Sequence, residues 1–173
     1  MRVARQLLLL LVSFTRSRFE AKEKTMPERK TLERAAEDKR EGKAPSTQAG
    51  EFVREEMEHV REGKHGARSA KQAIAIGLSK ARRAGVALKP PAKGKAPAKT
   101  RRSAKLATAA GKRKAAVSPR RSRATTDALK REGSSAASPT ALSRHAKAVA
   151  RKRGPAARSA AARKAARTRS RKS

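Results

Sequence analysis

Two helices and a short turn are predicted by residues 49–85, which read AGEFVREEMEHVREGKHGARSAKQAIAIGLSKARRAG. Pro45 breaks the chain before this stretch, and Ser46 or Thr47 can cap the helix that follows. Its apolar residues recur at helical spacing, and Gly63 is a typical helix-ending residue. These apolar residues are Ala49, Phe52, Val53, Met57 and Val60. The first half of the stretch is therefore expected to be a helix with one apolar side.

The second half of the stretch predicts another helix, from a Ser69 cap to Ala84 with Gly85 beyond it. One stripe of this helix is apolar and consists of Ala70, Ala73, Ile74, Gly77, Leu78 and Ala81. Small residues at 73, 77 and 81 would let another helix approach closely. The stripe predicts a tightly packed helical pair.

Upstream, Pro27 to Glu41 predicts a helix, because proline and Glu28 suit its first turn and Gly42 suits its end. Residues 26–88 carry 14 basic and 10 acidic residues, a mixture typical of solvated helix faces. We expect an all-α chain with a small two- or three-helix domain over residues 26–88.

The turn between the two later helices permits a helix-turn-helix interpretation, since the second helix is basic at its end. A plain helical hairpin is favoured instead. Apart from Arg68 and Gln72, no Arg, Asn or Gln lies near the start of the second helix, where base-reading residues usually lie. The first of the two helices is also acidic, with five glutamates that would repel phosphate: Glu51, Glu55, Glu56, Glu58 and Glu62.

The amino-acid sequence of residues 51–86 resembles that of a small bacterial family of unknown function. The likeness covers roughly residues 26–88. Members similar to it often begin as Met26-Pro27 does here and end in Lys/Ala-rich tails. The resemblance implies relatives of similar layout and no particular activity.

Residues 89–173 form a basic tail with 27 Lys and Arg against Asp127 and Glu132, a net charge of +25 out of +33 for the chain. The tail has no Phe, Tyr or Trp, so it has few large apolar groups whose burial could offset the entropy of ordering. We expect it to be largely disordered, with transient helices opening at Ser138-Pro139 and broken at Gly154-Pro155. Its Lys/Ala/Pro composition resembles the C-terminal tail of linker histones.

The tail predicts the nucleic-acid contacts, because Lys and Arg on a flexible chain can neutralise phosphates without reading sequence. The candidate residues are Lys93, Lys95, Lys99, Arg101, Arg102, Lys112, Arg113, Lys114, Arg120, Arg121, Arg123, Arg151, Lys152, Arg153, Arg163, Lys164, Arg167, Arg169, Arg171 and Lys172.

Residues 1–25 are a leader of doubtful status. An apolar run from Leu7 to Val12 follows two arginines, as in a secretory signal, but no small-x-small cleavage site follows. Lys22-Glu23 can be encoded as a ribosome-binding site upstream of Met26, so we expect translation to start at Met26. A signal or transit peptide and a genuine short extension are the alternatives.

Catalysis, metal binding and cofactor binding are not expected. His59 and His65 are the only histidines of the compact part, and pairing of His59 with Glu55 or Glu62 on the helix surface explains the pattern. With no Cys, the chain has no thiolate site, and it has no Gly-rich phosphate loop or nucleophilic triad pattern.

The composition therefore favours a non-enzymatic, cytoplasmic, nucleoid-associated protein that binds and compacts double-stranded DNA without sequence specificity. An RNA- or ribosome-associated role is the first alternative, and binding to a membrane surface or another polyanion is the second. No small-molecule substrate is expected, a membrane partner is disfavoured, and the oligomeric state is left open.

Overall fold

The computed structural model describes residues 27–113 and 118–170, and within these ranges it contains helices and no strand. The expected leader and the proposed start at Met26 lie outside the described residues. The elements are α2 (Arg29–Arg40), α3 (Pro45–Arg61), α4 (Ala70–Arg83), α5 (Ala98–Lys112), α6 (Pro119–Lys130), the 3-10 turn η1 (Ser135–Ala137) and α7 (Pro139–Ser170). The all-α prediction is confirmed for the described chain.

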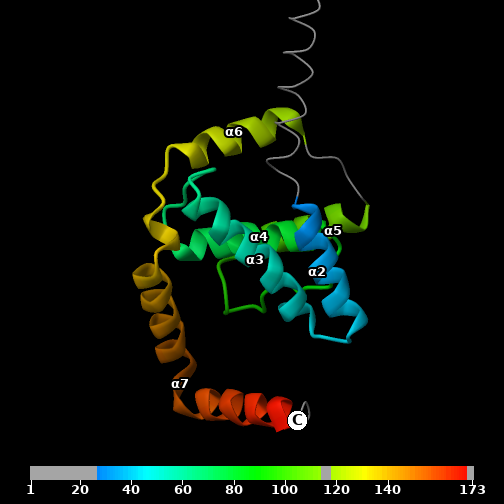
Figure 1. The fold of residues 1–173 in the computed structure, drawn as a ribbon, viewed down its shortest axis with the longest axis vertical. Coiled ribbons are helices and arrows are strands. Elements are labelled where there is room, and N and C mark those ends of the chain that lie inside the picture. The colour runs from blue at the N-terminus through cyan, green and yellow to red at the C-terminus, as the bar shows by residue number, and fades with distance from the viewer. Residues whose placement is uncertain (1–26, 114–117, 171–173) are drawn as a thin grey trace, which may run out of the picture.

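The α3/α4 pair is the centre of the fold, as the spacing of residues 49–85 predicts (Figure 1). Ser69 caps α4, and its side chain accepts a hydrogen bond from the backbone N–H of Gln72. At the crossing, a Cβ added at Gly77 would lie 2.7 Å from the Cα of Val53. The expectation that small residues allow a close approach is confirmed, because any side chain at 77 would force the two backbones apart.

Helix α2 packs against α3 and completes a small core. Ala35 of α2 lies with Ala49 and Phe52 of α3 and Ala81 of α4 in one buried cluster. Phe52 is the only large side chain in this cluster that is fully buried, so most of the core consists of methyl groups. Each buried methyl contributes far less hydrophobic free energy than a buried Leu or Phe.

The expectation of a largely disordered tail is wrong for the described residues beyond 88, which contain α5, α6, η1 and α7. Helix α5 packs against α4 through the buried Ala104 and Ala107. Near the end of α5, a Cβ at Gly111 would overlap the backbone carbonyl oxygen of Arg82. Close contact between small residues and backbone thus holds this part of the tail, although its sequence lacks large apolar groups.

The turn η1 returns the chain to the α3/α4 pair. Its Ala136 and Ala137 are buried with Met57 and Val60 of α3. The Nε–H of Arg61 donates to the carbonyl of Ala137 at 3.1 Å. Backbone hydrogen bonds from Gly66 to Leu129 and from Ala67 to Gly133 fasten the α3/α4 turn to the same segment. The tail is therefore anchored at two places, through α5 and through η1.

Helices α6 and α7 differ from the others because neither has a buried residue. Figure 1 shows α7 leaving the helical body and bending before its last part. The bend coincides with Gly154, whose φ of 73° and ψ of 166° are not helical, and Pro155 follows. The predicted start at Ser138-Pro139 and break at Gly154-Pro155 are confirmed, and the chain between them is helical.

Candidate nucleic-acid interface

The predicted nucleic-acid-binding residues lie on the outside of the molecule. All the described ones are exposed except Arg101, which is partly buried. Lys93 and Lys95 lie in the segment before α5; Lys99, Arg101, Arg102 and Lys112 lie on α5, with Arg113 at its end; Arg120, Arg121 and Arg123 lie on α6; and Arg151, Lys152, Arg153, Arg163, Lys164, Arg167 and Arg169 lie on α7. Lys114, Arg171 and Lys172 lie outside the described residues.

Helix α7 carries the largest share of this charge. It contains no Asp or Glu, and each of its Lys and Arg side chains is exposed. Its basic residues occur on both sides of the Gly154 bend. Exposed cations spaced along a helix can meet a row of phosphates without reading base sequence.

The two acids of the tail do little to offset this charge. Asp127 is exposed on α6. Glu132 lies 3.4 Å from Arg68, whose side chain is largely exposed, so this ion pair is weak. Neither acid lies on α7, whose positive charge is therefore uncompensated within the helix.

A cavity of about 810 Å³ lies where α4, α5 and α6 approach one another. Ile76 and Leu78 of α4 form an apolar part of its wall. Arg83 and Arg121 also line it, and both side chains are exposed cations. Arg82 also lines the cavity, and burial lowers the pKa of its guanidinium. The cavity continues inward to a cluster of charged side chains on α3 and α4.

This cluster contains two glutamates that the sequence interpretation placed on a solvated face. Glu55 is 3% exposed and Glu56 is fully buried. Lys80 of α4 lies between them, with its Nζ 3.3 Å from Glu55 Oε1 and 2.8 Å from Glu56 Oε2. A buried carboxylate needs such a partner because water no longer stabilises its charge.

The expected pairing of His59 with Glu55 or Glu62 is wrong. His59 is buried, and its Nε2 lies 2.8 Å from Oε1 of Glu28, the residue just before α2. This hydrogen bond, aided by Lys64, holds the pKa of the Glu28 carboxyl below its usual value. Helical spacing within α3 could not show a partner that comes from another segment.

His65, in the α3/α4 turn, is the other histidine of the cluster. Its Nε2 lies 3.1 Å from Oε1 of Glu56. The Glu56 carboxylate raises the pKa of the His65 imidazole even though burial opposes the charge. Burial alone would raise the pKa of Glu56, but His65 and Lys80 together hold it below its usual value.

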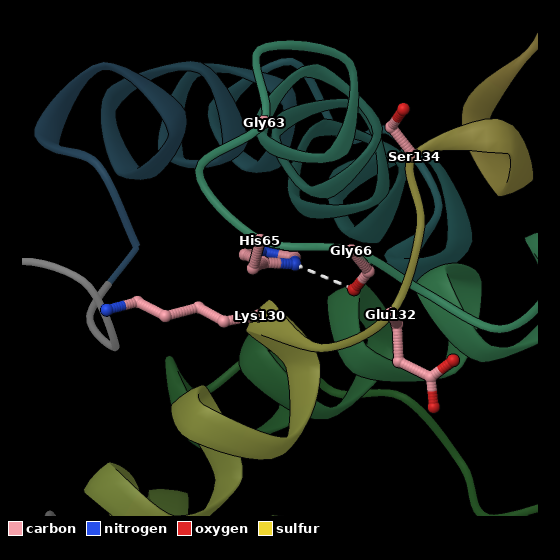
Figure 2. A pocket seen from close by; sticks show the side chains of 6 residues that line it. All are labelled: Gly63, His65, Gly66, Lys130, Glu132 and Ser134. Carbon is pink, nitrogen blue, oxygen red and sulfur yellow. Dashed lines mark hydrogen bonds between the residues drawn. The ribbon is translucent and has the colours of Figure 1, made fainter.

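Figure 2 shows His65 from the side where the tail returns, with its ring beside Gly66. A small cavity of about 250 Å³ lies here, lined by the α3/α4 turn and by Lys130, Glu132 and Ser134. The dashed line marks the contact of His65 Nδ1 with the Gly66 carbonyl oxygen at 3.1 Å. The position of this ring is therefore fixed by its own turn.

One group in the cluster has metal-ligating atoms close together. Glu56, His59 and His65 each place one such atom within 4.8 Å of the others. A sequence signal for Glu56 existed, because it lies four residues after Phe52 and four before Val60, on the buried stripe of α3. No spacing rule pointed to His65, which lies in a turn.

No protein-family model, no curated protein and no solved structure matches this chain. Among the described helices, none is both long and apolar enough to cross a membrane.

Proposed function

We propose that this protein binds double-stranded DNA without sequence specificity and compacts it, as a nucleoid-associated protein. One observation carries the proposal: α7 exposes Lys and Arg along its whole length, has no acid and has no buried residue. Leu142 of this helix packs against the core beside η1, while each of its Lys and Arg side chains is exposed to solvent, where phosphates can approach.

The magnitude of the charge supports a polymeric anion as the partner. The tail's net charge of +25 could neutralise about 25 phosphates, roughly a dozen base pairs, if every charge made contact. Each neutralised phosphate releases a counterion, so binding of this kind weakens steeply with salt. A small anionic ligand would use only a few of these charges.

The position of the single described aromatic residue favours a duplex over a single strand. Proteins that bind single strands usually stack bases on exposed aromatic rings. Phe52 is 1% exposed, so it offers no stacking surface. Backbone contact with a duplex needs no such ring.

The test uses fluorescence anisotropy to measure the affinity of the full chain for two labelled duplexes of unrelated sequence. The measurement is repeated over a series of salt concentrations. We expect similar affinities for both duplexes, and log affinity that falls by several units per log unit of salt, about 0.9 per phosphate contacted. A strong preference for one duplex, or a nearly flat salt dependence, would contradict the proposal.

Competition then separates the partners. Unlabelled duplex DNA, structured RNA and anionic vesicles are added at one salt concentration, with phosphate charge matched. DNA is expected to displace the probe at the lowest concentration. Decisive displacement by RNA would replace DNA with RNA as the partner, and displacement by vesicles would favour a membrane-surface role.

A further inference from the structure

We propose that Glu56, His59 and His65 form a binding site for a divalent transition-metal ion of the zinc type. Two imidazoles and one carboxylate are a ligand set that zinc uses in proteins. The site is independent of the basic surface, since its three ligands lie on α3 and in the α3/α4 turn.

The orientation of His65 is the first support. Its Nδ1 faces the carbonyl oxygen of Gly66, which can only accept, so Nδ1 donates a proton to it. In the neutral ring, the lone pair then lies on Nε2, which faces Glu56 Oε1 at 3.1 Å. A lone pair facing a carboxylate requires a cation between them, either a proton or a metal ion. Metal-binding histidines commonly donate their other N–H to a carbonyl in this way.

The geometry of Glu56 is the second support. Its side chain is fully buried, and neither carboxylate oxygen has a hydrogen-bond partner of acceptable geometry. His65 and Lys80 lie within ion-pair distance but are poorly aligned. Two ligands on one tetrahedral zinc lie about 3.3 Å apart, given bonds of about 2.0 Å. The 3.1 Å between His65 Nε2 and Glu56 Oε1 is close to that separation.

Lys80 and Glu28 define the surroundings of the ion. Lys80 contacts Oε2 of Glu56 and also Glu55, so Oε1 is the oxygen on the His65 side and the one assigned to the metal. Glu28 currently accepts from His59 Nε2 and from Lys64. Its side chain is half exposed, so it can turn away from His59 or become a fourth ligand.

The balance of charge also favours a cation. Three carboxylates, Glu28, Glu55 and Glu56, face two ammonium groups, Lys64 and Lys80. Among these five groups negative charge exceeds positive charge by one, which a bound metal ion would more than supply. The three ligands line the cavity of about 810 Å³, which gives an ion a route from solvent.

The experiment is a titration of the full chain with Co²⁺ and Zn²⁺ in a buffer without chelator. Co²⁺ is expected to give the visible absorption of a four-coordinate site at one equivalent, and Zn²⁺ to abolish that absorption by displacement. In proton NMR of the wild-type chain, Zn²⁺ should shift the ring signals of His59 and His65. A spectrum typical of hydrated Co²⁺ would overturn the proposal.

The chain supplies its own control, because His145 is its only other histidine and lies on α7. His65→Gln is expected to weaken Co²⁺ binding by about 100-fold or more, and His145→Gln to leave it unchanged. Retention of affinity in His65→Gln, or a zinc-induced shift of the His145 signal alone, would contradict the site. The NMR arm uses only wild-type protein, so it decides the question even if His65→Gln fails to fold.

Discussion

Helices α3 and α7 are both rich in charged residues, but they place these residues in opposite environments. In α3, Glu55 and Glu56 are buried and paired with cations from outside the helix. In α7, every described charged side chain is exposed, and the helix has no acid. The contrast shows that charge density alone does not indicate which charges meet solvent. Glu55 and Glu56 of α3 contribute to the body of the fold, whereas the charges on α7 face solvent.

The largest expected effect compares α7 with the helical body by removing four charges from α7 and, as a control, four from exposed positions of α2 and α4. Replacing Arg151, Lys152, Arg163 and Arg167 of α7 by Gln is expected to weaken duplex binding by up to about 1,000-fold at 0.15 M salt, because each lost phosphate contact removes about 0.9 from the salt slope. Fluorescence anisotropy over a salt series measures both quantities.

The matched control replaces Lys30, Lys39, Arg40 and Lys71 by Gln, which lowers the net charge equally on exposed positions of α2 and α4. We expect a much smaller loss of affinity. Equal losses in the two variants would mean that total charge, rather than α7, determines binding.

The second effect concerns the α3/α4 crossing. Gly77→Ala places a Cβ 2.7 Å from Val53 Cα, so the helices must separate, and we expect the free energy of unfolding to fall by about 1–3 kcal/mol. Gly50→Ala in α3 meets no atom within 4 Å and should raise stability by about 0.5–1 kcal/mol. Urea unfolding followed by circular dichroism measures both changes. Equal effects of the two substitutions would show that the crossing is looser than described.

The third effect tests whether the tail is anchored by η1. Ala137→Asp would bury a charge beside Met57 and Val60, so η1 should detach, with a loss of about 1–3 kcal/mol and faster tryptic cleavage at Arg131. Ala160→Asp on exposed α7 is the control and should leave stability unchanged. If Ala137→Asp behaves like the control, η1 does not contribute to the core.

The smallest effect concerns helix capping. Ser69→Ala removes the side-chain acceptor for the N–H of Gln72 and should cost about 1 kcal/mol of unfolding free energy. Ser118→Ala is its counterpart on α6, where the serine makes no capping hydrogen bond, so a smaller cost is expected. Thermal unfolding of the two variants gives the comparison, and a larger cost at Ser118 would contradict the assigned caps.

The end of α3 and both ends of α4 were predictable from sequence, because they follow from Gly63, the Ser69 cap and the apolar stripe. The predicted cap at Ser46 or Thr47 is wrong, because α3 begins at Pro45 with Ala44 as its N-cap. The break in α7 was also predictable, because Gly154-Pro155 is a local signal. The ordering of the tail was not, since the prediction relied on large apolar groups while α5 and η1 pack through Ala104, Ala107, Ala136 and Ala137.

The exposure of the candidate nucleic-acid-binding residues was predictable, and nearly all the described ones are exposed. Their arrangement on α5 and α6 was not predicted, and on α7 only transient helices were expected. The buried charge cluster was missed because its partners, Glu28, Glu56, His65 and Lys80, come from separate segments. Periodicity within one helix gives no information about such pairing.

The alanine-rich core has a thermal consequence. The heat capacity of unfolding rises with the apolar surface exposed and falls with the polar surface exposed. This core exposes methyl groups and paired charges when it unfolds, with Phe52 as its one fully buried aromatic ring. Its heat-capacity change on unfolding should therefore lie below the value of average domains, which is about 12–15 cal/mol/K per residue. The free energy of unfolding should therefore be less strongly curved as a function of temperature than in an average domain.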